Sequence, residues 1–209
     1  MKALDLIASS LHRRDDEPNK RLAQQIAQTH AVDWVKELVA NLHNPDKNLQ
    51  SDCIKVLYEI GELGSADLIA PYTKEFINLL SSKNNRMVWG AMSALDTIAP
   101  VNPAEVFSFL SQIVSALDKG SVITKDHGVG ILATLSGIDE YAEVATPLLY
   151  EQLRVCVAKQ LPQYAEKAAK VVTEENRELL ISIIYERFEE VETDTRKKRL
   201  TKLLKHISK

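Results

Sequence analysis

Apolar positions in this chain recur at helical spacing and then repeat as a block. Within residues 79–99 they include Leu80, Met87, Ala91, Leu95 and Ile98. A matching series of apolar and small residues occurs 38 residues earlier and 37 residues later, and it returns in weaker form towards the C-terminus. A period of 35 to 38 residues made of paired helices is typical of an α-solenoid, in which each pair buries its apolar face against the next.

The repeat predicts an all-α chain, a right-handed α-α superhelix of about six antiparallel helix pairs. We expect one repeat domain over residues 1–209, with repeats at 2–31, 32–64, 66–100, 102–138, 139–172 and 173–209. The first repeat is shorter and more charged, as expected of an end cap that has one face in water.

Several residues mark the expected helix ends and the closely packed positions. Asn102 and Pro103 form a strong helix start, since Asn suits the N-cap and Pro the first turn. Gly61 and Gly64 are expected to end the helix at 49–63. Gly128 and Cys53 share a column of small residues, so we expect a neighbouring helix to pack closely against both.

Two stretches carry a resemblance to a known family. NPDKNLQSDCIKVLYEIGELG (44–64) and KNNRMVWGAMSALDTIA (83–99), with prolines at Pro71 and Pro147, resemble the HEAT-repeat family of armadillo-like solenoids. The resemblance covers about residues 32–172. It implies that the second helix of each pair lines a concave surface, and it identifies an architecture rather than one function. The aspartate–basic ladder of many such repeats appears only in fragments, at Asp46/Lys47 and Arg86.

The resemblance, combined with the rotation of 100° per helical residue, selects candidate partner-binding residues. They are the side chains that we expect to face away from the core stripe of the second helices. The set is Lys55, Tyr58, Trp89, Ser93, Lys167, Lys170, Lys198, Lys202 and Lys205.

Trp89 is the aromatic member of this set that no other repeat has at the same place. Trp and Tyr are side chains that protein interfaces favour, so Trp89 and Tyr58 are candidate anchors for a partner. Packing of Trp89 against a neighbouring repeat is the other interpretation, and the sequence leaves both open.

Charge separates sharply near the C-terminus. Residues 174–192 are rich in glutamate, whereas residues 196–209 hold seven Lys or Arg and no acid. The two segments could pair with each other, which contributes little at an exposed surface. Alternatively, the basic side chains form a wall for an acidic partner. We therefore expect a non-catalytic protein–protein interaction scaffold, with an acidic protein segment held on the concave face.

A nucleic-acid-binding function is the alternative. HEAT-like alkylpurine DNA glycosylases are also short solenoids, and Trp89 lies where they carry an aromatic residue. One helical turn later, where the resemblance to these glycosylases predicts an acidic residue, this chain has Ser93. A net charge of −3 also disfavours a duplex binder.

The remaining features exclude several classes of protein. At 45% apolar and 26% charged residues the chain is globular. No His or Cys pair has the spacing of a metal site, and no nucleophile–base pair is evident, so we expect no enzyme activity, no metal and no cofactor. No apolar run is long enough for a membrane span, and the pattern at the N-terminus is not the one expected of a signal peptide. A cytoplasmic protein, monomeric or weakly self-associating, is expected.

Overall fold

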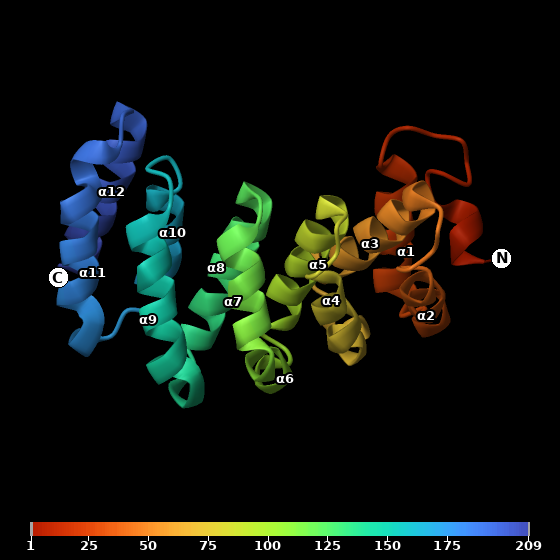
Figure 1. Cartoon of the computed structure of the whole chain (residues 1–209), viewed down its shortest axis with the longest axis horizontal. Helices are drawn as coiled ribbons and strands as arrows, with labels where there is room; N and C mark the ends of the chain where they lie inside the picture. The colour runs from red at the N-terminus through yellow and green to blue at the C-terminus, as the bar shows by residue number, and fades with distance from the viewer. Residues whose placement is uncertain (1, 209) are drawn as a thin grey trace. The chain divides into compact units, whose positions relative to one another are not determined.

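The computed structural model of the chain describes residues 2–208, and this part is built of α-helices and short 3-10 helices without strands (Figure 1). The first three repeats contain η1 (Ala3–Leu6), α1 (Glu17–Thr29), α2 (Val32–Ala40), α3 (Lys47–Glu62), η2 (Ala66–Leu68), η3 (Ala70–Tyr72), α4 (Thr73–Leu79) and α5 (Asn85–Ile98). The last three contain α6 (Pro103–Ser108), α7 (Leu110–Lys119), α8 (Val122–Ser136), α9 (Asp139–Val155), α10 (Leu161–Ala169), α11 (Glu174–Arg187), η4 (Phe188–Glu190) and α12 (Asp194–Ile207).

The helices confirm the all-α prediction, and α1, α3, α5, α8, α10 and α12 are the second helices of the six expected pairs. Contacts divide the chain into two compact units, unit 1 (Met1–Gly128) and unit 2 (Val129–Lys209), with the division inside α8. The expected single domain stays a prediction, and each unit is described by itself.

In unit 1 the second helices α1, α3 and α5 pack side by side, and α2 and α4 pack against α3 and α5 (Figure 1). Met87, Ala91, Leu95 and Ile98 are fully buried, which confirms the predicted core stripe. Gly90 explains the close approach of α3 and α5: a Cβ there would lie 2.7 Å from Cγ1 of Ile54. Such a contact forces a neighbour to move, so the helices can approach only because the side chain is missing.

The helix ends in unit 1 follow the turn chemistry with one correction. The carboxylate of Asp46 accepts the backbone N–H of Asn48 at 2.8 Å and so caps α3. The expectation that Gly61 ends this helix is wrong, because α3 continues to Glu62. Gly61 is needed for packing, since a Cβ there would collide with the side chain of Thr97. Gly64, at φ 85°, is the left-handed residue beyond the helix end.

In unit 2 the second helices α10 and α12 pack on each other, and α9 packs against both α10 and α11. Tyr164 and Leu200 are almost completely buried in this core. Pro162 lies in the first turn of α10, as predicted. Thr173 is the N-cap of α11, and its backbone N–H donates to Oδ1 of Asn176 at 2.9 Å. No helix in residues 2–208 combines the length and apolar character needed to cross a bilayer.

Candidate partner-binding surfaces

Three of the predicted site residues meet where α3 and α5 pack together. The rings of Tyr58 and Trp89 have centroids 5.6 Å apart and planes tilted by 57°. Nζ of Lys55 lies 4.8 Å from the Tyr58 ring centroid. Both geometries fall in the range of favourable aromatic and cation–π contacts. We call Lys55, Tyr58, Glu59 and Trp89 the aromatic cluster.

Lys55 is already occupied within this cluster. It is only 8% exposed, and its ammonium group pairs with Glu59 on the next turn and with Asp16 at 3.3 Å. Burial acts to lower the pKa of Lys55, but the hydrogen bond to Glu59 and the contact with Tyr58 outweigh it and raise that pKa. The ammonium therefore stays charged, and it links α3 to Asp16 at the start of α1 rather than facing solvent.

The expected outward positions of Lys55, Tyr58 and Ser93 are wrong. Tyr58 is 6% exposed and Ser93 is 1% exposed. The hydroxyl of Ser93 donates to the carbonyl of Trp89 at 2.9 Å. The reason is that α5 packs against α3, α4 and α6, so its buried arc is much wider than one core stripe. Trp89 itself is half-buried, so it packs against Tyr58 and still presents part of its ring to solvent.

Ionisable side chains that the sequence analysis did not pair lie beside the aromatic cluster. Nδ1 of His127 is 2.9 Å from a carboxylate oxygen of Asp96, which joins α8 to α5 within unit 1. Burial, together with the charge of Glu59, raises the pKa of Glu62. The helical spacing in the sequence places Asp96 on the face opposite the core stripe. It does not predict His127 as the partner of Asp96, because His127 lies 31 residues later and belongs to no repeating column.

The second surface lies on α10 and α12 in unit 2. We call Lys167, Lys170, Lys198, Lys202 and Lys205 the basic surface. Its three lysines on α12 follow the spacing of one helix face. The two helices are joined by Arg199, whose guanidinium donates to Glu166 at 2.9 and 2.6 Å. The Arg199 hydrogen bond is the main cause that lowers the pKa of Glu166, and the charges of Lys170 and Lys202 add to it. These side chains therefore share one surface around Glu166.

Most lysines of the basic surface form no ion pair within the described part of the chain. Lys170, Lys198, Lys202 and Lys205 are exposed, and their ammonium groups make no hydrogen bond or ion pair with any residue from 2 to 208. In that same part of the chain the acidic segment reaches α12 through Glu189, which pairs with Lys197 at 2.7 Å. Mutual pairing of the acidic and basic segments thus accounts for Lys197 and not for the basic surface.

The two thiols and the acidic groups give no reactive centre among the described residues. Burial raises the pKa of Cys53 to about 12, and burial also raises that of Cys156. Both thiols therefore stay protonated at neutral pH. Residues 2–208 contain no cluster of three His, Cys, Asp or Glu side chains placed to hold a metal ion. At the position where a HEAT-like DNA glycosylase would carry an acidic residue, this chain has Ser93, and its side chain is buried.

Neither protein-family models nor curated proteins match this sequence. Solved structures do match its fold. A computationally designed armadillo repeat protein for modular peptide recognition has a TM-score of 0.66 at 13% identity, with 97% of each chain covered. The chain has an armadillo/HEAT-like α-solenoid fold.

Two further structures share this solenoid fold. A designed armadillo repeat protein in complex with the peptide (KR)4 has a TM-score of 0.67 at 15% identity, over 90% of this chain and 86% of that one. An engineered protein has a TM-score of 0.61 at 19% identity, over 100% and 97% of the two chains. At these identities the likeness concerns the fold of the solenoid, which confirms the resemblance found in the repeats.

Proposed function

We propose that this solenoid is a non-catalytic scaffold that binds an acidic segment of another protein on the basic surface of α10 and α12. One observation carries the proposal: Lys170, Lys198, Lys202 and Lys205 are exposed without an ion-pair partner in the described chain. Like charges four residues apart on a helix destabilise it by about 0.2–0.5 kcal/mol per pair. An acidic segment laid along the two helices removes this repulsion and gains charge-assisted hydrogen bonds.

Solenoid folds suit such a role because neighbouring repeats present side chains along an extended face. One of the structural neighbours is described as a design for modular peptide recognition, and another was solved with a basic peptide. In unit 2 of the present chain the exposed surface is itself basic, so it would repel a basic peptide and attract an acidic one. The proposal therefore keeps the peptide as the kind of ligand and takes the acidic character from the basic surface.

The test measures binding of a fluorescent peptide of Asp and Glu residues to the full chain at low salt, by anisotropy. Changing Lys170, Lys198 and Lys202 to Glu should weaken binding by about tenfold or more, which corresponds to about 1.4 kcal/mol. Raising the salt concentration should weaken binding to the unchanged protein, because the lysines of the surface are exposed.

The matched control changes Lys47, Lys74 and Lys83 of unit 1 to Glu. These lysines are also exposed and their side chains are unpaired in the described residues, so the net charge changes equally while the basic surface stays intact. Equal weakening in both triple variants would mean that net charge, rather than this surface, governs binding. A DNA duplex serves as the second probe. Tighter binding of the duplex than of the acidic peptide would replace the protein-binding proposal with the nucleic-acid alternative.

A further inference from the structure

A polar cavity of about 530 Å³ lies in unit 1, away from the basic surface. It forms where the loop at residues 8–16, between η1 and α1, lies against the first turns of α3 and α5. Its size falls in the range of small-molecule sites. Three arginines, Arg13, Arg14 and Arg86, and three aspartates line it together with His12.

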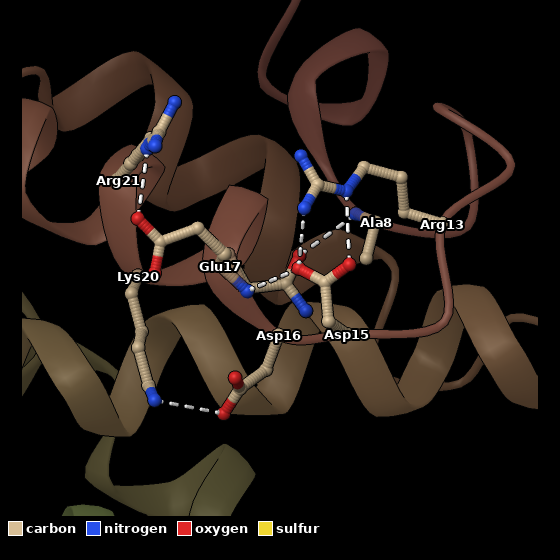
Figure 2. A network of polar contacts seen from close by, with 8 residues as sticks. Ala8, Arg13, Asp15, Asp16, Glu17, Lys20 and Arg21 are labelled. Atoms are coloured by element: carbon tan, nitrogen blue, oxygen red, sulfur yellow. Dashed lines mark hydrogen bonds and ion pairs between the residues drawn. The ribbon is translucent and has the colours of Figure 1, made fainter.

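Each aspartate of the cavity already has partners in the fold. The guanidinium of Arg13 donates two hydrogen bonds of 2.9 Å to the carboxylate of Asp15 (Figure 2). Asp16 pairs with Lys20 at 3.2 Å, as drawn in the same view, and with Lys55. These contacts lower the pKa values of Asp15, chiefly through Arg13, and of Asp16, chiefly through Lys20. Both carboxylates are therefore ionised and neutralised locally.

Asp52, the third acid, accepts two hydrogen bonds from neutral donors. They come from the backbone N–H of Ser9 and from the amide of Asn19, each at 2.7 Å. Its oxygens thus fix the loop against α3. The lining holds three arginines and three aspartates, so its formal charges balance, and Lys20 from outside the lining adds one positive charge beside Asp16.

The remaining cationic side chains of the lining are uncommitted. Arg14 and Arg86 are exposed, and within residues 2–208 their guanidinium groups make no hydrogen bond or ion pair. The ring of His12 is equally without a partner in that part of the chain, and its backbone has a left-handed φ of 56°. The oxygen of the Ser9 hydroxyl, also in the lining, is buried and has no hydrogen-bond partner among the described residues. The guanidinium groups of Arg14 and Arg86 and the ring of His12 are therefore available as hydrogen-bond donors to a ligand.

We propose that this cavity binds a phosphate monoester, with Arg14 and Arg86 as its principal ligands and His12 as an additional donor. A guanidinium presents its N–H groups as a planar fork, which matches the oxygens of a phosphate in a bidentate contact. An imidazole N–H donates a further hydrogen bond in either tautomer. The cavity exceeds one phosphate group in volume, so it also accommodates part of the group that carries the phosphate. This inference is independent of the basic surface in unit 2.

The test follows backbone and arginine side-chain signals by NMR during titration with inorganic phosphate, O-phosphoserine and glucose 6-phosphate. Shifts that saturate and centre on residues 9–16, 48–52 and 86 are expected. Tighter binding of O-phosphoserine indicates a phosphorylated side chain as the source of the phosphate, whereas tighter binding of the sugar phosphate indicates a free metabolite. Absence of saturable shifts in these residues with all three compounds would overturn the proposal.

Variants then assign the binding to the two arginines. Arg14→Gln with Arg86→Gln should weaken binding by about tenfold or more. Lys74→Gln with Lys83→Gln removes the same charge from unit 1 outside the cavity, and it should change affinity by less than about twofold. Because both arginines are exposed and unpaired among the described residues, their loss should leave the fold intact, which the same spectra verify. Equal affinities of the two double variants would contradict the assignment.

Discussion

The second helices of unit 1 and unit 2 carry lysines in comparable positions, yet the structure treats these side chains differently. Lys55 on α3 is 8% exposed and has two acidic partners. Lys170 at the C-terminal end of α10 and Lys202 on α12 are exposed and make no ion pair in the described chain. The repeat position therefore determines which helix face a side chain occupies. Its neighbours on other repeats determine whether its charge stabilises the fold or remains available to a partner.

The buried apolar stripe is what both units share, and its loss should give the largest effect. Leu95→Ala in α5 and Leu200→Ala in α12 should each lower the free energy of unfolding by about 2–5 kcal/mol, since both side chains are completely buried. Denaturant unfolding followed by circular dichroism measures this. Leu179→Ala is the control, because Leu179 is 46% exposed and should change stability by less than about 0.5 kcal/mol. Similar losses in all three variants would mean that the helical register is incorrect.

The charged pair of α3 should give the next largest effect and sharpen the contrast between the units. Lys55→Met removes the cation from Glu59, whose side chain is 16% exposed, and should cost about 1–3 kcal/mol. Lys198→Met in unit 2 should be nearly neutral, within about 0.5 kcal/mol. Thermal and urea unfolding of the two variants provide the comparison. If the exposed lysine cost as much as the buried one, the proposed difference between the surfaces would not hold.

The pair of Glu166 and Arg199 should have the smallest effect, with a definite dependence on pH. Its side chains are 40% and 46% exposed, so solvent screening limits its contribution to below about 1 kcal/mol. The folded-state pKa of Glu166 is lowered, so this contribution is present above the unfolded pKa of about 4.3 and is lost as pH falls through the folded value. The stability difference between the unchanged protein and Arg199→Gln should therefore disappear in acid.

Urea unfolding of both proteins at neutral pH and at about pH 3 measures this linkage. Glu166→Gln serves as the control, because it should already lack the pH-dependent part at neutral pH. A difference that persists unchanged in acid would show that Arg199 acts through packing of its aliphatic stem rather than through the ion pair.

The repeat pattern predicted the helices and their apolar cores because both depend on local spacing. Met87, Ala91 and Leu95 are buried as expected, and Pro103 begins α6 as expected. The pattern placed Ser93 wrongly, since a single core direction cannot describe a helix that is flanked by several others. These contacts come from α4 of the same repeat and from helices of the neighbouring repeats, and the pattern within α5 does not predict them.

Ion pairs and hydrogen bonds between residues far apart in the sequence are the second feature that the repeat pattern did not predict. Lys55 meets Asp16, and His127 meets Asp96, across different repeats. These partners occupy no repeating column, so no offset predicts them. The cavity in unit 1 was missed for the same reason: the loop at 8–16 brings Arg14 near Arg86, and that proximity depends on how three elements pack.

The contact between Tyr58 and Trp89 also makes the chain its own optical reporter. The protein contains two tryptophans, and Trp34 lies on α2 while Trp89 packs against Tyr58 on α3. A half-buried indole beside another repeat has an emission colour that depends on how closely the two helices are apposed. Replacing Trp34 with Phe would leave Trp89 as the single tryptophan, at the contact between α3 and α5. Its fluorescence emission maximum would then report loosening of this contact without any added label.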